Sequence, residues 1–560
     1  MTDLEIARSI TPKHIFEVGQ ALGLASDDLM PFGRYKAKLS LRLTESLQAR
    51  PRGRYVLVTA INPTPLGEGK TTTSIGLGMG LCRLGHRAAV TLRQPSLGPV
   101  FGIKGGGTGG GRAQVYPMED INLHFTGDAH AVSAAHNLLS AFVDNHLFHG
   151  NSLHLDPQSV RWPRTLGVSD RALREVVLGD GTGGRPGRFV ITEASEIMAI
   201  LALATDYADL KGRLGNILIG LTRDGRVLRA SDFNCVGSMA VLLKEALLPN
   251  LVQTLEGTPA FVHTGPFGNI AHGNCSIVSD LLAVRCADYV ITEAGFGSDL
   301  GAEKFFNIKC RASGLYPDAA VVVATLRALK LHGGGGTIKV GAPLPAGLTG
   351  PNQSALEKGF GNLEQHIANV RVHGVPVVVA VNAFKDDPVE ELQWVRERAK
   401  AVGAVDAAVS THWADGGQGS EELAQAVVKA ASEGAVFRHL YDVAWPIRKK
   451  IGAIATTIYG ASGVSFSKQA ESDMEMAENL GCADLPICMA KTPLSLSHDP
   501  SLKGRPSGFI VPIHEVRILS GAGFLTAICS GIQLMPGLPT KPAGERIDFD
   551  TVSGTIVGLS

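Results

Sequence analysis

Short apolar runs alternate with longer amphipathic stretches from residue 55 onward. The apolar runs predict buried β-strands at 55–61, 87–92, 216–221, 259–263, 288–292, 319–325, 376–382 and 405–410. The amphipathic stretches predict helices at 70–84, 128–146, 194–211, 236–246, 269–286, 353–372, 388–402 and 420–434. Strands that alternate with helices are typical of a doubly wound, mostly parallel sheet, so we expect an α/β protein.

The two ends of the chain have a different pattern. Residues 1–50 are helical in pattern, with a basic helix expected near 35–50. A stretch rich in glycine and proline at 333–352 predicts a loop or boundary. Strand-like runs at 485–490, 508–518 and 524–534 follow a helix near 440–458. We therefore expect three domains, a large one at 1–352, a smaller α/β domain at 353–456 and a small mixed α+β domain at 457–560.

A phosphate-binding loop is predicted directly after the first strand of the sheet. The strand at 55–61 leads into a turn with prolines and glycines, then into Lys70-Thr71-Thr72 and a helix. The spacing is that of G-x-x-x-x-G-K-T, with Thr64 at the first glycine position. Lys70 is expected to contact the β- and γ-phosphates of a nucleotide, and the Thr71 hydroxyl to bind Mg²⁺. The alternative is an ordinary glycine-rich turn, which would not need Gly-Lys-Thr-Thr at the start of a helix. The predicted nucleotide loop comprises Thr64, Pro65, Leu66, Gly67, Glu68, Gly69, Lys70 and Thr71.

A second glycine cluster follows the strand at 87–92. It runs from Arg93 to Arg112 and contains Lys104 among its glycines. Ligands of open α/β sheets collect at the carboxyl ends of strands, and an arginine there can bind a carboxylate or phosphate through two hydrogen bonds. Glycine runs also form flexible linkers, but the flanking basic residues favour an anion site.

Several acidic and aromatic side chains lie near predicted strand ends. Phe384 and Trp413 each come just after an apolar strand, where a flat ring can face a planar ligand or act as a core or lid residue. The acidic candidates for a metal or a reacting group are Asp120, Asp128, Glu293 and Asp299. A helix cap or a salt bridge explains any one of these acids equally well, so a second Mg²⁺ ligand is not identified.

Composition narrows the classes of function. Lys and Arg number 52 and so do Asp and Glu, so a chain of 560 residues has a formal net charge of zero. The protein therefore has no overall positive electrostatic field that would favour binding to nucleic acid or to an anionic membrane surface. The eight cysteines form no C-x-x-C pair, which indicates a reducing compartment rather than a disulfide framework or zinc site. Without an apolar signal segment or a run long enough to span a bilayer, we expect a cytoplasmic protein.

Blocks of sequence along nearly the whole chain resemble formate–tetrahydrofolate ligase (10-formyltetrahydrofolate synthetase). The matching blocks are TPLGEGKTT at 64–72, LRQPSLGPVFGIKGG at 92–106, MEDINLHFTGD at 118–128, NLVQTLEGTPAFVHTGPFGNIAHG at 250–273, ITEAGFGSDLGAEKF at 291–305, VATLRALKLHGG at 323–334, VNAF at 381–384 and MPGLP at 535–539. Several blocks in one order are far more specific than a phosphate loop alone.

The resemblance implies a two-step ligation that uses MgATP, formate and tetrahydrofolate. Formate attacks the γ-phosphate to give formyl phosphate and ADP, and N10 of tetrahydrofolate then takes the formyl group. The large domain at 1–352 would bind nucleotide and formyl phosphate. Family members are typically homotetramers that monovalent cations activate.

The resemblance also implies roles for individual residues. Catalytic roles fall to Lys70, Arg93 and Asp128, and the formate or formyl phosphate site to Arg93, Gln94, Lys104, Gly105 and Gly106. The folate site would comprise Asn382, Phe384, Trp413 and, more weakly, Phe296.

Departures from the family pattern gather on the formate and folate side. They are Gln94 in place of a glutamate, Thr108 and Arg112 in the glycine cluster, Asp415 and Gln418 after Trp413, and the segment 493–496. Two alternatives to a formate ligase therefore stay open. One is a relative that activates another small carboxylate, and the other is a catalytically weak nucleotide-binding relative.

Overall fold

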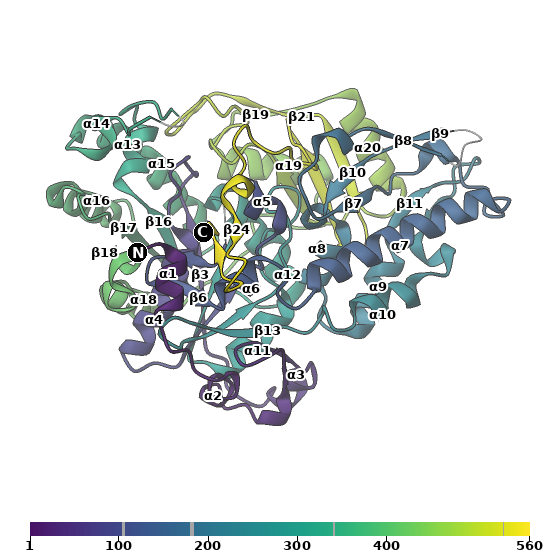
Figure 1. Cartoon of the computed structure of the whole chain (residues 1–560). Helices are drawn as coiled ribbons and strands as arrows, with labels where there is room; N and C mark the ends of the chain where they lie inside the picture. The colour runs from purple at the N-terminus through teal and green to yellow at the C-terminus, as the bar shows by residue number, and fades with distance from the viewer. Residues whose placement is uncertain (103–106, 180–183, 340–341, 530, 560) are drawn as a thin grey trace.

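A sheet of twelve strands organises the protein (Figure 1). The computed structural model describes the whole chain except residues 103–106, 180–183, 340–341, 530 and 560. The main path of the sheet runs in the order β1 (Leu29–Pro31), β2 (Ala37–Leu39), β13 (Asn250–Thr254), β14 (Pro259–Val262), β4 (Ala88–Leu92), β15 (Tyr289–Glu293), β3 (Arg54–Ala60), β16 (Ala319–Ala324), β17 (Val377–Asn382) and β18 (Asp406–Ser410). Two short strands, β5 (Gly109–Gly110) and β6 (Ala113–Tyr116), extend from β13.

Along the path from β14 to β18 each strand is parallel to the next, whereas β13 and β14 are antiparallel. This arrangement confirms the predicted α/β fold with a large, mostly parallel sheet. β17 and β18 fall within the expected second domain at 353–456, yet they continue this same sheet, since β17 pairs with β16 and β18 pairs with β17. The division into three domains stays a prediction.

Helices cover both faces of the sheet because its central strands are apolar on both faces. Val56 and Val58 of β3 pack against one set of helices, whereas Tyr55 and Leu57 pack against the other. The first face is covered by α4 (Lys70–Arg83) and α18 (Glu421–Glu433). The second face is covered by α11 (Ile277–Cys286), α13 (Leu326–His332), α15 (Gln353–Arg371) and α16 (Val389–Ala401).

A second core lies beside the sheet and is largely helical. Its helices are α7 (Asp128–Phe148), α8 (Glu196–Leu203), α9 (Tyr207–Gly215) and α10 (Val236–Leu243). The predicted helix at 194–211 is two helices, α8 and α9. The predicted strand at 216–221 exists as β11 (Leu218–Leu221), but it pairs with β12 (Val227–Arg229) in a separate hairpin, not with the large sheet. No helix in the described ranges has the length and apolar character needed to cross a membrane.

The C-terminal elements form their own core at the top of Figure 1. They comprise α19 (Ile447–Ala453), β19 (Gly463–Phe466), α20 (Lys468–Asn479), β20 (Ile487–Ala490), β21 (Ile510–Ile513), β22 (Glu515–Leu519) and β23 (Phe524–Ile528). β20, β23 and β22 form one small sheet, and β19 pairs with β21. Phe524 joins the core of α7 to α10, so this unit is packed onto the helices beside the large sheet.

Two predicted helices are wrong in part. The basic stretch at 35–50 contains strand β2 and only a short helix, α3 (Arg42–Ser46). β2 is a strand because its three residues are buried and pair with β1 and β13, and tertiary pairing overrides local helix propensity. The helix predicted at 269–286 begins at Ile277, where the Ser276 hydroxyl accepts a hydrogen bond from Ser279 N and caps α11.

Buried histidines should make the stability of the fold depend on pH. Burial lowers the pKa of six histidines to about 4, namely His136, His263, His332, His366, His373 and His412. Their ordinary pKa is 6.5, so below that pH the unfolded chain binds protons that the folded chain does not. Stability that is present above pH 6.5 is therefore lost as the pH falls toward 4.

Three buried carboxyl groups act in the opposite direction. Burial raises the pKa of Glu193 and Glu196 to about 7 and that of Glu303 to about 8. The stability that these groups contribute at low pH is therefore lost as the pH rises from 4.5 to these values. Because there are six such histidines and only three such carboxyl groups, the loss of stability caused by the histidines dominates below pH 6.5. We expect the midpoint of thermal unfolding to be highest near neutral pH and to fall steeply toward pH 5, as circular dichroism would measure. An equal midpoint at pH 5 and pH 7 would contradict this expectation.

Candidate active site

Four parallel strands of the sheet end at one edge with the predicted site residues. β4 leads into Arg93, β15 ends at Glu293, β3 leads into the predicted phosphate loop, and β17 ends at Asn382. In the sheet, β15 lies between β4 and β3, and β16 separates β3 from β17. Because carboxyl ends of parallel strands share an edge, the fold brings together residues far apart in the sequence.

The predicted phosphate loop has the expected order of strand, glycine turn and helix. Gly67 and Gly69 adopt φ angles of 73° and 74°, a left-handed conformation that favours glycine. The Glu68 carboxylate accepts a hydrogen bond from Thr64 N at 2.8 Å, and Asn382 Nδ2 donates to the Glu68 carbonyl at 3.0 Å. A Cβ atom at Gly69 would lie 2.3 Å from Asn382 Nδ2, so this close approach also requires glycine. Nucleotide binding by the loop stays a prediction.

Lys70 and Thr71 begin α4, and they contact the last residue of β15 and the segment that follows it. Lys70 Nζ donates a hydrogen bond to the Phe296 carbonyl at 3.1 Å. Phe296 has a left-handed φ of 58°, a strained conformation for a non-glycine residue that is common at functional sites. Thr71 Oγ1 donates to Glu293 Oε2 at 2.8 Å. The predicted phosphate-binding and metal-binding side chains therefore meet at Glu293 and Phe296.

Arg93 lies near the other oxygen of the Glu293 carboxylate. Its Nε lies 3.8 Å from Glu293 Oε1. A Cβ atom at Gly295 would lie 3.0 Å from Arg93 Nη1, and one at Gly268 would lie 3.6 Å from it, so the guanidinium packs closely against both loops. Thr71 and Arg93 thus both face one buried glutamate, and Lys70 contacts the segment that follows it.

Several buried polar atoms around Arg93 have no hydrogen-bond partner among the described residues. They are Arg93 Nε, Gln94 Oε1, Thr264 Oγ1, Asn269 Oδ1, Asn274 Oδ1 and both ring nitrogens of His272. The segment 264–274 follows β14 and bonds to its neighbours, since Gln94 N donates to the Thr264 carbonyl and Gly295 N donates to that of Gly273. Buried polar groups without partners are rare in folded proteins, so these atoms are suited to bind a small polar ligand or water.

The second glycine cluster is held by residues distant in sequence. Gly107 N donates to Asn122 Oδ1 at 2.9 Å, and Gly111 N donates to Asp3 Oδ1 at 2.8 Å. Thr108 is buried, and Arg112 N donates to the Trp413 carbonyl at 2.8 Å. These bonds argue against a flexible linker for this part of the cluster. The predicted anion-binding residues Lys104, Gly105 and Gly106 lie outside the described residues.

Phe384 and Trp413 follow adjacent strands, because Asn382 of β17 pairs with Ser410 of β18. The Trp413 side chain lies on α17 (His412–Asp415) and is 53% exposed, and Phe384 is 36% exposed. The guanidinium of Arg327 lies 3.8 Å from the centroid of the Phe384 ring. Both rings thus keep free surface at the edge that carries the loop, as a planar ligand requires. Folate binding by these rings stays a prediction.

The residues next to Trp413 are tied to the structure around α4. Asp415 accepts a hydrogen bond from Thr411 Oγ1 at 2.6 Å, and Gln418 begins the short helix η8 (Gln418–Ser420). His412 is buried, and its Nε2 lies 3.2 Å from Thr72 Oγ1. No motif in the sequence indicated this contact, which joins positions 340 residues apart. It links the Trp413 helix to the first turn of α4.

Asp128 lies in a buried ion pair. Its Oδ1 accepts a hydrogen bond from Lys38 Nζ at 2.8 Å, and its Oδ2 accepts one from Asn250 Nδ2 at 2.7 Å. Lys38 is fully buried in β2, so the Asp128 carboxylate neutralises a charge that water cannot reach. This contact gives Asp128 a structural task at the start of α7. Its catalytic role stays a prediction.

We expect Asp128→Ala to lower the free energy of unfolding by about 3–5 kcal/mol, because it leaves Lys38 buried without its counter-charge. Urea unfolding would measure this change. The matched control is the double variant Lys38→Met with Asp128→Leu, which removes both charges and should lose less stability. Unchanged unfolding together with lost turnover would instead show that Asp128 acts on the substrates.

Comparison with known proteins agrees with this geometry. The family model for formate–tetrahydrofolate ligase matches residues 1–560. The chain is similar to formate–tetrahydrofolate ligase 3 of Rubrobacter xylanophilus, with 53% identity that covers 100% of both chains. It is also 53% identical to the formate–tetrahydrofolate ligase of Roseiflexus sp. (strain RS-1) over 100% of both chains, and to that of Saccharopolyspora erythraea over 100% of this chain and 99% of the relative. Because these matches run from end to end and include the strand ends that hold Lys70, Arg93 and Glu293, the chain belongs to the formate–tetrahydrofolate ligase family.

Proposed function

We propose that this chain ligates formate to tetrahydrofolate with ATP and releases 10-formyltetrahydrofolate, ADP and phosphate. The observation that carries the proposal is that Thr71 and Arg93 both contact Glu293 and that Lys70 bonds to the Phe296 carbonyl, in a chain of this family. A phosphate-binding helix start and an arginine beside it are what the activation of a carboxylate by ATP requires.

In the first step, a carboxylate oxygen of formate attacks the γ-phosphorus, and ADP leaves with the electrons of the broken P–O bond. Lys70 lies at the start of α4 and neutralises charge on the transferring phosphoryl group. Arg93 holds formate through two hydrogen bonds and orients its oxygen toward the phosphorus. Gln94 can orient a ligand through its amide, although it cannot accept a proton as a carboxylate can.

Mg²⁺ is the metal that this site suits. Thr71 Oγ1 and Glu293 Oε2 are 2.8 Å apart, and a hydroxyl with one carboxylate is a typical partial ligand set for Mg²⁺, which takes its remaining ligands from phosphates and water. Among the described residues no group of three or more His, Cys, Asp or Glu side chains is arranged to hold a metal, which is consistent with a metal that enters with the nucleotide. When bound, Mg²⁺ supplies charge neutralisation on the β- and γ-phosphate oxygens.

We expect Glu293→Gln to raise the Mg²⁺ concentration for half-maximal activity by about tenfold and to lower kcat. The amide keeps the size of the side chain but removes the negative charge beside Thr71. A magnesium titration at saturating ATP measures the effect, with the exposed Glu245→Gln as the matched control. An unchanged magnesium requirement would remove Glu293 from the metal site.

In the second step, N10 of tetrahydrofolate attacks the formyl carbon and phosphate leaves with the bridging oxygen. Phe384 and Trp413 offer exposed rings on which the planar pterin can stack, and the Phe296 carbonyl accepts a hydrogen bond from Lys70 Nζ. Asn382 is 8% exposed and bonds to the Glu68 carbonyl, so we assign it mainly to holding the phosphate loop in place.

Formate labelled with ¹⁸O in both oxygens tests the formyl phosphate intermediate. If the carboxylate attacks phosphorus, one labelled oxygen appears in the released phosphate and the other stays in the formyl group. Mass spectrometry of the phosphate reads out the transfer. Unlabelled phosphate, formed together with 10-formyltetrahydrofolate, would contradict the intermediate.

The family resemblance alone supports a homotetramer, activation by a monovalent cation and a cytoplasmic location. We include these in the proposal. Light scattering on the purified protein measures the assembly, and activity in potassium compared with tetramethylammonium salts measures the need for a small cation.

A further inference from the structure

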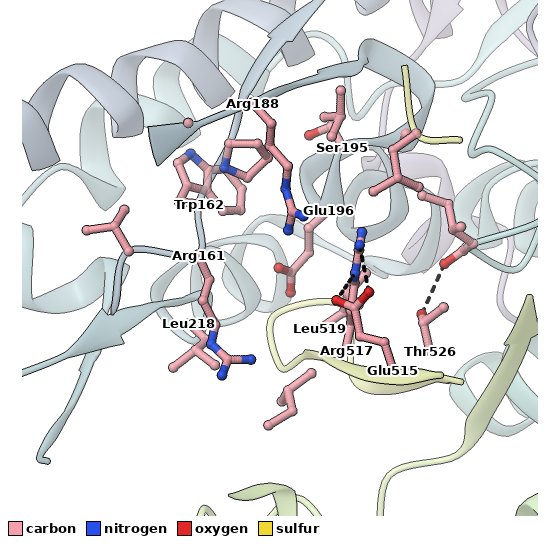
Figure 2. A pocket seen from close by; sticks show the side chains of 18 of the residues that line it. Arg161, Trp162, Arg188, Ser195, Glu196, Leu218, Glu515, Arg517, Leu519 and Thr526 are labelled. Atoms are coloured by element: carbon pink, nitrogen blue, oxygen red, sulfur yellow. Dashed lines mark hydrogen bonds and ion pairs between the residues drawn. The ribbon is translucent and has the colours of Figure 1, made fainter. Parts of the chain in front are cut away.

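A cavity of about 550 Å³ lies between the helices beside the large sheet and the C-terminal strands. Figure 2 shows its walls, which come from the segment 160–163, the start of α8, and strands β22 and β23. None of the described candidate active-site residues lines it. Volumes of about 300–1,000 Å³ are usual for sites that bind small molecules, and such sites favour the boundaries between packed units.

Arginine side chains dominate the charge of this cavity. Figure 2 shows Arg161, Arg188 and Arg517 reaching into it from three different segments. Arg517 forms a two-fold ion pair with Glu515, at 2.6 and 3.0 Å. Arg161 Nη1 lies 4.0 Å from Asp473 Oδ1. Arg188 is exposed, and its guanidinium forms no hydrogen bond or ion pair with any residue in the described part of the chain. The cavity therefore contains at least one guanidinium whose donors are available to a ligand.

The carboxylates that line the cavity are largely engaged. Asp473 accepts hydrogen bonds from Gln469 Nε2 at 2.9 Å and from Val516 N at 3.0 Å. Glu196 accepts two backbone N–H groups of the turn before β23, and burial raises its pKa to about 7, so it carries only part of a charge at neutral pH. Glu175 is exposed at the rim. Two further arginines bond elsewhere, Arg174 to the Met535 carbonyl and Arg185 to Asp144.

The three central arginines repel one another. Burial, and then the positive charge of Arg517, lower the pKa of Arg188; Glu515 opposes this effect and Arg161 adds a smaller lowering. Burial alone would raise the pKa of Glu515. The nearby positive charges of Arg517, Arg188 and Arg161 outweigh burial and lower that pKa. An anion placed between Arg188 and Arg161 would relieve this repulsion and could accept several guanidinium N–H donors at once.

The remaining walls suit the body of an organic ligand. Trp162 stacks on His136 with ring centroids 4.2 Å apart, and the His136 ring is fixed by the Ser195 hydroxyl at 2.8 Å. Val190, Leu218 and Leu519 add apolar surface. The cavity thus combines a rigid, partly apolar wall with free arginine donors.

We propose that this cavity is a binding site for a small organic anion with more than one oxyanion group, held between Arg188 and Arg161. Polycarboxylates and phosphorylated compounds share this chemistry. The site is separate from the proposed phosphate loop and does not depend on the ligase assignment.

Isothermal titration calorimetry with citrate and with tripolyphosphate tests the proposal on the full-length protein. We expect at least one of them to bind, and the affinity to fall by tenfold or more in Arg188→Gln and further in the double variant with Arg161→Gln. The control Arg223→Gln removes an exposed arginine outside the cavity and should leave binding unchanged. Thermal unfolding of each variant checks that the fold is kept.

Tripolyphosphate can also bind the proposed phosphate loop, so the Lys70→Ala variant is titrated as well. Binding that survives Lys70→Ala but is lost in Arg188→Gln supports the cavity. Binding of citrate alone identifies a polycarboxylate site, and binding of tripolyphosphate alone identifies a site for phosphorylated compounds. Binding that Arg161→Gln with Arg188→Gln leaves intact, or no binding of either anion outside the phosphate loop, would overturn the proposal.

Discussion

Replacing Lys70 with alanine is expected to slow ADP formation by about 10³-fold, the largest effect that we predict for a single side chain. Lys70 begins α4 at the predicted phosphate loop, and its ammonium lies 3.1 Å from the Phe296 carbonyl next to Glu293. With alanine the helix can still begin at the same residue, but the ammonium that would neutralise the transferring phosphoryl group is lost. A coupled assay for ADP with formate and tetrahydrofolate at saturation measures the loss.

The matched control for Lys70→Ala is Lys211→Ala, which removes an exposed lysine from α9. Both variants should unfold at the temperature of the unaltered protein. Turnover near the normal rate in Lys70→Ala would show that the loop after β3 does not bind the reacting phosphates.

Arg93→Ser should lower kcat/KM for formate by about 10²-fold, equivalent to about 2.7 kcal/mol of transition-state stabilisation. The guanidinium lies among buried polar atoms that have no partners in the described residues, and it is the cation that most directly suits a carboxylate there. ATP affinity should change far less, because we expect the nucleotide to bind the loop after β3 rather than Arg93. Steady-state kinetics with formate varied, together with equilibrium binding of ATP, separates the two effects.

Arg93→Lys provides an informative comparison with Arg93→Ser. Lysine keeps the charge but cannot form the two parallel hydrogen bonds of a guanidinium, so this variant should retain part of the activity. Equal loss of ATP binding and of formate-dependent turnover in Arg93→Ser would place Arg93 in the nucleotide site. No change in formate dependence would place the formate site elsewhere.

The large sheet was predictable because buried parallel strands are short, nearly continuous apolar runs. β3, β15, β16 and β17 lie within two residues of their predicted bounds. The glycine turn after β3 was predictable for a related reason, since Gly67 and Gly69 occupy backbone conformations that other residues rarely adopt. Phosphate binding by this turn stays a prediction. Local sequence determines both features.

Contacts between distant segments were not predictable. Lys38 belongs to a basic stretch that predicts a helix, but pairing with β13 and neutralisation by Asp128 make it a buried strand residue. Glu293 was one of several acids without a distinguishing role until the sheet placed β15 between β3 and β4. The contact of His412 with the start of α4 likewise depends on how strands order in space, which a single sequence does not specify.

A coupled product assay on the purified protein tests the central proposal most directly. The protein is supplied with MgATP, formate and tetrahydrofolate, and ADP is followed together with 10-formyltetrahydrofolate, the latter after acid conversion to the absorbing methenyl form. We predict equal formation of both products, with a strict requirement for all three substrates. ADP without formylated folate, or neither product from protein that still binds nucleotide, would contradict a formate–tetrahydrofolate ligase activity for this chain.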